Sequence, residues 1–110
     1  MRMLLAAVLA SALPAAAHFA ECTTMDGVRK ARCERHMDMY KKCGPLQGDA
    51  HFACDREFLI ANPLQCDKFS GDEAGKCTKE VAAFKTCEAN AGMDFMKCVR
   101  NTTGESPMGH

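Results

Sequence analysis

Eight evenly spaced cysteines constrain the fold of this 110-residue chain more than any other feature. An even number at this density is typical of small secreted domains cross-linked by disulfides. The chain has six Phe, one Tyr and no Trp, so few large side chains are left to fill a core. We therefore expect disulfides to add the stability that a small core lacks. The cysteines are Cys22, Cys33, Cys43, Cys54, Cys66, Cys77, Cys87 and Cys98.

A glycine recurs at one position in four of the segments between cysteines. Each of these segments reads Cys-x4-Gly-x5-Cys, and the glycines are Gly27, Gly48, Gly71 and Gly92. Glycine permits the left-handed backbone that a tight connection often needs. We interpret the pattern as four repeat units that form two similar halves, residues 22–65 and 66–110.

Apolar residues follow each of these glycines at helical spacing, and no stretch alternates as a strand would. The pattern predicts helices over 26–42, 49–61, 71–87 and 93–101. Ser70 and Glu73 match a capping box at the start of the third helix. In the first helix we expect an apolar stripe of Cys33, Met37, Tyr40 and Cys43. Its basic residues are expected on a solvated face; they are Arg29, Lys30, Arg32 and Arg35.

The predicted fold class is all-α, with two disulfide-stapled helical hairpins built from four short helices. Short connections at 43–48 and 88–92 would form the hairpins, and the 62–70 segment would join them. The first cysteine of each unit falls at a helix junction and the second on a helix, so the bridges should staple neighbouring helices. Eight cysteines allow about a hundred pairings, and the spacing leaves the choice open.

Residues 1–17 have the pattern of a cleavable signal peptide. Arg2 precedes an apolar run over 3–13, and Ala15-Ala16-Ala17 offers a cleavage site. The run is shorter than the ~20 residues of a membrane span, so we expect no span in the mature chain. We predict a disulfide-rich helical domain over 18–101 and a flexible C-terminal tail over 102–110. Asn101 begins a glycosylation sequon, which agrees with secretion.

Two segments, Cys33-x9-Cys43 and Cys77-x9-Cys87, carry an aromatic residue three positions before the second cysteine: Tyr40 and Phe84. In this the chain resembles the twin Cys-x9-Cys helical-hairpin (coiled-coil-helix) proteins of the mitochondrial intermembrane space. The resemblance implies oxidative folding there and a structural or assembly role. The partner segments of this chain depart from that pattern, because they are Cys-x10-Cys with an internal glycine.

A zinc site is a further alternative. Cys33-x2-His36 and His51-x2-Cys54 would supply four ligands of the kind that zinc prefers if their helices faced each other. A small zinc-binding protein is therefore a second alternative. The competing interpretation is oxidised cysteines beside surface histidines, and on that interpretation no cofactor is expected.

Charge and motifs favour a non-catalytic role. The 14 basic and 14 acidic residues balance, so nothing indicates nucleic-acid binding. A pairing of Cys33 with His36 as nucleophile and base would need a thiolate, which an oxidised framework does not offer. We expect no enzyme but a secreted, disulfide-stabilised binding or signalling/effector protein. Its partner would be an extracellular protein or receptor that the sequence does not identify.

Overall fold

The computed structural model describes residues 21–109, which contain helices and no β-strand. The predicted all-α class is confirmed, and each predicted helix end lies within two residues of the observed one. A short 3-10 helix begins each half: η1 (Glu21–Thr24) and η2 (Cys66–Lys68). The α-helices are α2 (Gly27–Cys43), α3 (Gly48–Ala61), α4 (Gly71–Cys87) and α5 (Gly92–Thr103).

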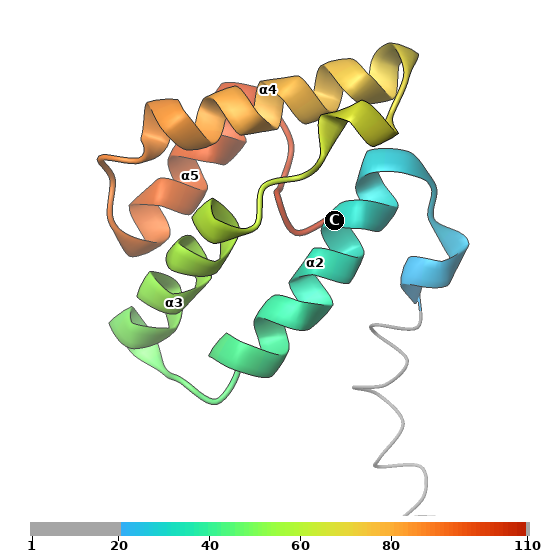
Figure 1. The fold of residues 1–110 in the computed structure, drawn as a ribbon. Coiled ribbons are helices and arrows are strands. Elements are labelled where there is room, and N and C mark those ends of the chain that lie inside the picture. The colour runs from blue at the N-terminus through green and yellow to red at the C-terminus, as the bar shows by residue number, and fades with distance from the viewer. Residues whose placement is uncertain (1–20, 110) are drawn as a thin grey trace, which may run out of the picture.

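The helices form two hairpins, α2 with α3 and α4 with α5 (Figure 1). Helix α4 crosses above the first hairpin in this view, and α5 packs against both α3 and α4. The link over residues 62–70 carries η2 and connects the two hairpins. The second half therefore packs against both helices of the first.

Every disulfide joins the two cysteines of one repeat unit. The pairs are Cys22–Cys33, Cys43–Cys54, Cys66–Cys77 and Cys87–Cys98. All four have the same sequence separation, 11 residues, and Cα–Cα distances of 5.4–5.7 Å. Two pairs close the hairpins, and the other two attach η1 and η2 to the helices that follow them. Within residues 21–109, no disulfide connects one half to the other, so the halves are held together by packing and polar contacts.

The repeat glycines explain why the units share this geometry. Each is the first residue of its α-helix and has a φ between 48° and 59°. This left-handed conformation reverses the chain between the first cysteine and the helix that carries the second. At Gly48, a Cβ atom would meet nothing within 4 Å, so the backbone conformation alone demands glycine there.

We expect Gly48→Ala to destabilise the fold by about 1–2 kcal/mol, since left-handed backbone costs that much for residues with a Cβ atom. Gly75 is the matched control, because it lies inside α4, has open space around it and has no positive φ. Gly75→Ala should instead stabilise the fold by about 0.5–1 kcal/mol. Urea unfolding of both variants measures the difference, and equal signs would contradict this account.

The core lies where the two hairpins meet. Phe84 on α4 and Phe95 on α5 pack with their ring centroids 5.5 Å apart. Two disulfides contribute to this core, because Cys43 and Cys87 are fully buried within it. The other buried members are Met39, Leu59, Ala83 and Val99. All four α-helices thus contribute to one core.

The buried face of α2 differs from the prediction. Tyr40 is 53% exposed and Met37 is half-buried, so the stripe through these residues is wrong. The prediction that the basic residues of this helix lie on a solvated face is also wrong for Arg32 and Arg35, because both are buried. Arg29 is exposed, and Lys30 is half-buried. The observed stripe still follows the helical period through Val28, Arg32, Arg35, Met39 and Cys43.

Polar side chains cap helices across the two halves. The predicted capping box is wrong, because Ser70 makes no side-chain cap bond. Glu73 instead reaches the start of α2, where its Oε1 accepts a hydrogen bond from the Val28 N–H at 3.3 Å. Arg56 on α3 donates to the carbonyls of Glu88 and Asn90, just after α4. A carboxylate at a helix N-terminus and a guanidinium beyond a C-terminus both complement the helix dipole.

Candidate functional site

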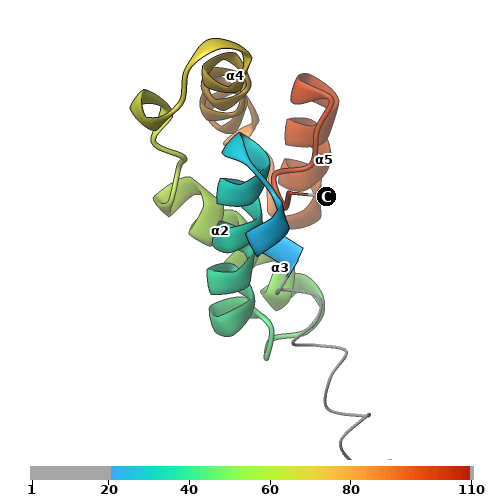
Figure 2. The same ribbon diagram turned by 90° about the vertical axis from the view of Figure 1, so that its right-hand side faces the viewer.

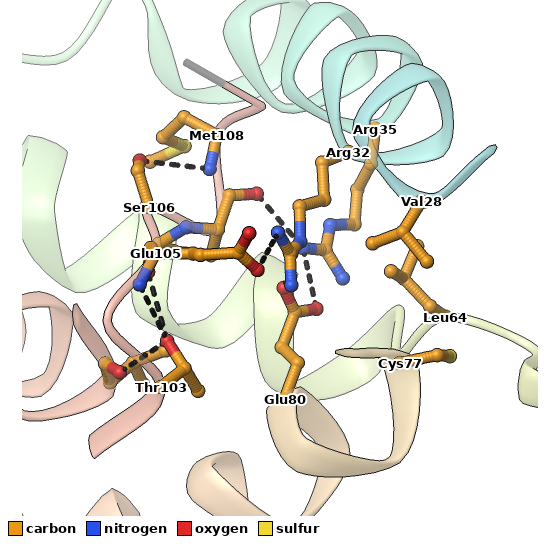
Figure 3. Close-up of polar contacts among 12 residues, drawn as sticks. Val28, Arg32, Arg35, Leu64, Cys77, Glu80, Thr103, Glu105, Ser106 and Met108 are labelled. Carbon is orange, nitrogen blue, oxygen red and sulfur yellow. Dashed lines mark hydrogen bonds and ion pairs between the residues drawn. The ribbon is translucent and has the colours of Figure 1, made fainter. Parts of the chain in front are cut away.

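A cluster of buried charges lies between α2 and α4. Arg32 and Arg35 point from α2 towards Glu80 on α4 (Figure 3). Glu80 Oε2 lies 2.6 Å from Arg32 Nε, and Glu80 Oε1 lies 2.8 Å from Arg35 Nη2. The exposed fractions are 4%, 7% and 1% for Arg32, Arg35 and Glu80. One carboxylate therefore bridges two guanidiniums out of contact with water, at the boundary between the two halves.

A second carboxylate balances the charge of this cluster. Glu105 Oε2 lies 3.0 Å from Arg32 Nη1, so the four residues carry two positive and two negative charges. Burial lowers the pKa of the Arg35 guanidinium, an effect that the charge and hydrogen bond of Glu80 oppose and that Arg32 reinforces. Buried charges are tolerated when they are paired, and each guanidinium here has a carboxylate partner. The hydrogen bonding is incomplete, because Arg35 Nε and Glu80 Oε1 are buried without a hydrogen-bond partner within residues 21–109.

The segment after α5 folds back over the cluster. The Pro107 carbonyl accepts a hydrogen bond from Arg35 Nη2 at 2.9 Å, and the Gly109 carbonyl accepts one from Arg29 Nε at 3.2 Å. Pro107 and Gly109 are buried, and a Cβ atom at Gly109 would lie 2.8 Å from the Cys33 nitrogen. Both ribbon views place this segment between α5 and α2 (Figures 1 and 2).

The sequence predicts a flexible tail over residues 102–110. Thr102 and Thr103 are the last residues of α5, and residues 104–109 contact α2. The turn between α5 and residues 104–109 is held by the Thr103 hydroxyl, which accepts a hydrogen bond from the Glu105 N–H at 3.1 Å. Residues 104–109 therefore form part of the folded domain in this structure, and their mobility in solution stays a prediction.

The four proposed zinc ligands are not brought together. Cys33 is bonded to Cys22 and Cys54 to Cys43, so neither sulfur is a thiolate ligand. His36 lies on α2, and His51 lies on α3 beside Asp55. Within residues 21–109, no group of three or more His, Cys, Asp and Glu side chains is placed to hold a metal ion.

Two other predicted features concern export. Asn101 is exposed in the last turn of α5, where a glycan would project into solvent. The signal peptide over 1–17 lies outside the described residues. Of the helices within 21–109, none has both the length and the apolar character to cross a membrane.

The half-buried His51 and the buried Asp55 form a polar pair that the sequence analysis did not identify. His51 Nδ1 lies 2.8 Å from the Cys43 carbonyl oxygen, and His51 Nε2 lies 3.1 Å from Asp55 Oδ2. Both ring nitrogens thus face oxygen atoms. A neutral imidazole has one N–H, so both bonds form only when the pair carries an additional proton, on the ring or on the carboxyl.

We expect this pair to make stability depend on pH. Burial raises the pKa of the Asp55 carboxyl above its ordinary value of 3.8, an effect that His51 partly opposes. The folded chain therefore holds this proton to higher pH than the unfolded chain, and rising pH removes stability in that window. The free energy of unfolding of the wild type, minus that of Asp55→Asn, should fall as pH rises above about 4. Urea titrations from pH 3 to 8 test this, and a difference that rises with pH would contradict it.

The fold defines a class: a disulfide-stapled, all-α protein of two helical hairpins with a charge cluster buried between them. No protein-family model, curated protein or solved structure matches the chain. The two Cys-x9-Cys segments lie on α2 and α4. Their four cysteines are not bonded to one another, because each pairs with the other cysteine of its own Cys-x4-Gly-x5-Cys unit. Four structural disulfides are compatible with an oxidising compartment such as the extracellular space or the intermembrane space.

Proposed function

We propose that this chain is a secreted, non-catalytic binding protein. The observation that carries the proposal is that all eight cysteine sulfur atoms form local bridges, which fix the shape of a small domain. A preorganised surface loses little conformational entropy when a partner binds, so such stapling favours recognition. The signal-peptide pattern of residues 1–17 supports export, and export supplies the oxidising conditions that the bridges need.

The chemistry of the interior supports a role other than catalysis. A nucleophilic cysteine needs a thiolate, and Cys33 is bonded to Cys22. Glu80, the most deeply buried carboxylate, is held between two guanidiniums. Its oxygens are therefore engaged in ion pairs that join α2 to α4. We infer that these groups serve to hold the binding surface in place.

The test is expression of the full chain in a eukaryotic secretory host. We expect the medium to contain a chain that begins at His18 and has no thiol that alkylates before reduction. Leu9→Arg, which interrupts the apolar run of the leader, should keep the chain out of the medium. Asn101→Gln should remove any glycan mass and leave secretion unchanged.

The same experiment separates the alternatives. An uncleaved chain found between the mitochondrial membranes would overturn secretion and favour the structural or assembly role. Free thiols that bind zinc in the native material would overturn the stapled architecture. Each outcome is read from intact mass, cell fractionation and thiol alkylation of one preparation.

A further inference from the structure

A basic pocket opens between α2, α5 and the segment over 104–109. Its volume is about 290 Å³, and the walls include two glycines of that segment. The charged and hydroxyl side chains in its lining are Arg29, Arg32, Arg100, Glu105 and Ser106. Three guanidiniums from two helices thus converge on one hollow at the surface.

The positive charge of this pocket is only partly neutralised. Arg32 is paired with Glu80 and Glu105, and Arg35 behind it is paired with Glu80. Arg29 and Arg100 are exposed. Arg29 uses its Nε for the Gly109 carbonyl, which leaves its terminal nitrogens available.

Arg100 is the second uncompensated charge. Within residues 21–109 it makes no ion pair and no side-chain hydrogen bond. Among residues 21–109, two carboxylates therefore face four guanidiniums in and beneath the pocket, so these six side chains carry an excess of two positive charges.

The donors in the pocket suit a tetrahedral oxyanion. Guanidinium groups bind sulfate and phosphate oxygens through paired N–H donors. The Ser106 hydroxyl accepts the Met108 N–H at 3.2 Å, so its own proton is left to donate. We propose that this pocket binds a sulfate or phosphate group carried by a larger ligand. This deepens the proposed function and rests on the chain being a binding protein, for which it names the chemistry of the partner.

The test is calorimetric titration of the full oxidised chain at low ionic strength, where exposed charges are least screened. The probes are inorganic sulfate, inorganic phosphate, a sulfated disaccharide and a sugar phosphate. We expect the oxyanions to bind, and the two sugar esters to show whether the group comes from a sulfate or a phosphate ester. Arg100→Gln should weaken binding about tenfold, the effect of losing one charge-assisted contact.

Two further variants keep the result specific. Lys42→Gln removes the same charge from the exposed end of α2, about 20 Å from Arg29 along the helix, and should leave binding unchanged. Glu105→Gln keeps an acceptor for Arg32 but removes the opposing charge, so it should tighten binding. All three variants should keep the helical circular dichroism of the wild type.

If oxyanion affinity is unchanged in Arg100→Gln, or is weakened equally in Lys42→Gln, the proposed oxyanion site is wrong. Failure of every oxyanion to bind would also overturn it, while a secreted, oxidised chain in the same preparation would leave the proposed function standing. A chain retained in mitochondria that still loses oxyanion binding in Arg100→Gln would overturn secretion and leave the pocket standing.

Discussion

Glu80→Gln is expected to lower the free energy of unfolding by about 3–5 kcal/mol, the cost of removing one partner from a buried ion pair. Glutamine keeps the shape of Glu80 but leaves Arg32 and Arg35 without their shared negative charge. Neither guanidinium can reach water without moving, because Arg32 and Arg35 are 4% and 7% exposed. Urea unfolding followed by circular dichroism measures the loss.

Glu34→Gln is the matched control. Glu34 is exposed on α2 and makes no ion pair within the described residues, so its substitution should change stability by less than about 0.5 kcal/mol. The double variant Arg35→Gln/Glu80→Gln should lose less than the sum of the two single variants, since one fewer guanidinium stays unpaired. Additive losses would show that the cluster does not act as a unit.

The large expected loss of stability in Glu80→Gln depends on the positions of the disulfides, none of which joins the two halves of residues 21–109. Each bridge lies within one repeat unit, so both halves stay internally cross-linked when Glu80 is altered. What Glu80 joins is α2 to α4, one helix from each half. We therefore expect the variant to loosen the packing between the halves while the helices of each half remain.

The sequence was sufficient for the architecture but not for this cluster. The helical spacing after the repeat glycines predicted the four α-helices of residues 21–109. This was possible because the left-handed φ of Gly48 and its three counterparts depends only on the local sequence. Charged residues are rarely buried, so the sequence favours a solvent-exposed position for Arg32 and Arg35. A signal was nevertheless present: Val28, Met39 and Cys43 fall in step with both arginines on one helical face.

The disulfide pairing was left open by the sequence analysis, although the repeat pattern carries a signal for it. Four segments with the same Cys-x4-Gly-x5-Cys pattern should adopt the same local conformation, and in each the paired Cα atoms lie 5.4–5.7 Å apart. That distance suits a disulfide. The return of residues 104–109 to α2 was not predictable, because it depends on Arg29 and Arg35 meeting carbonyls about 70 to 80 residues away in the sequence.

Cys87→Ala/Cys98→Ala is expected to destabilise the fold by about 4–5 kcal/mol. Closing a loop of this length contributes about 3 kcal/mol through the entropy of the unfolded chain. The rest is lost packing, because both sulfurs lie in or against the core that Phe95 and Val99 of α5 complete. Without the bridge, α5 is no longer tied to the end of α4.

Cys66→Ala/Cys77→Ala is the matched control, since its bridge has the same 11-residue separation and hence the same loop entropy. It ties only the short η2 to α4, a helix that Glu80 and Phe84 continue to anchor. Cys77 is fully buried but lies outside the core where the hairpins meet, so the loss should stay closer to the loop contribution of about 3 kcal/mol. Denaturant unfolding of both double variants reports the difference directly. Equal losses would mean that the core around Phe84 and Phe95 gains no additional stability from the Cys87–Cys98 bridge.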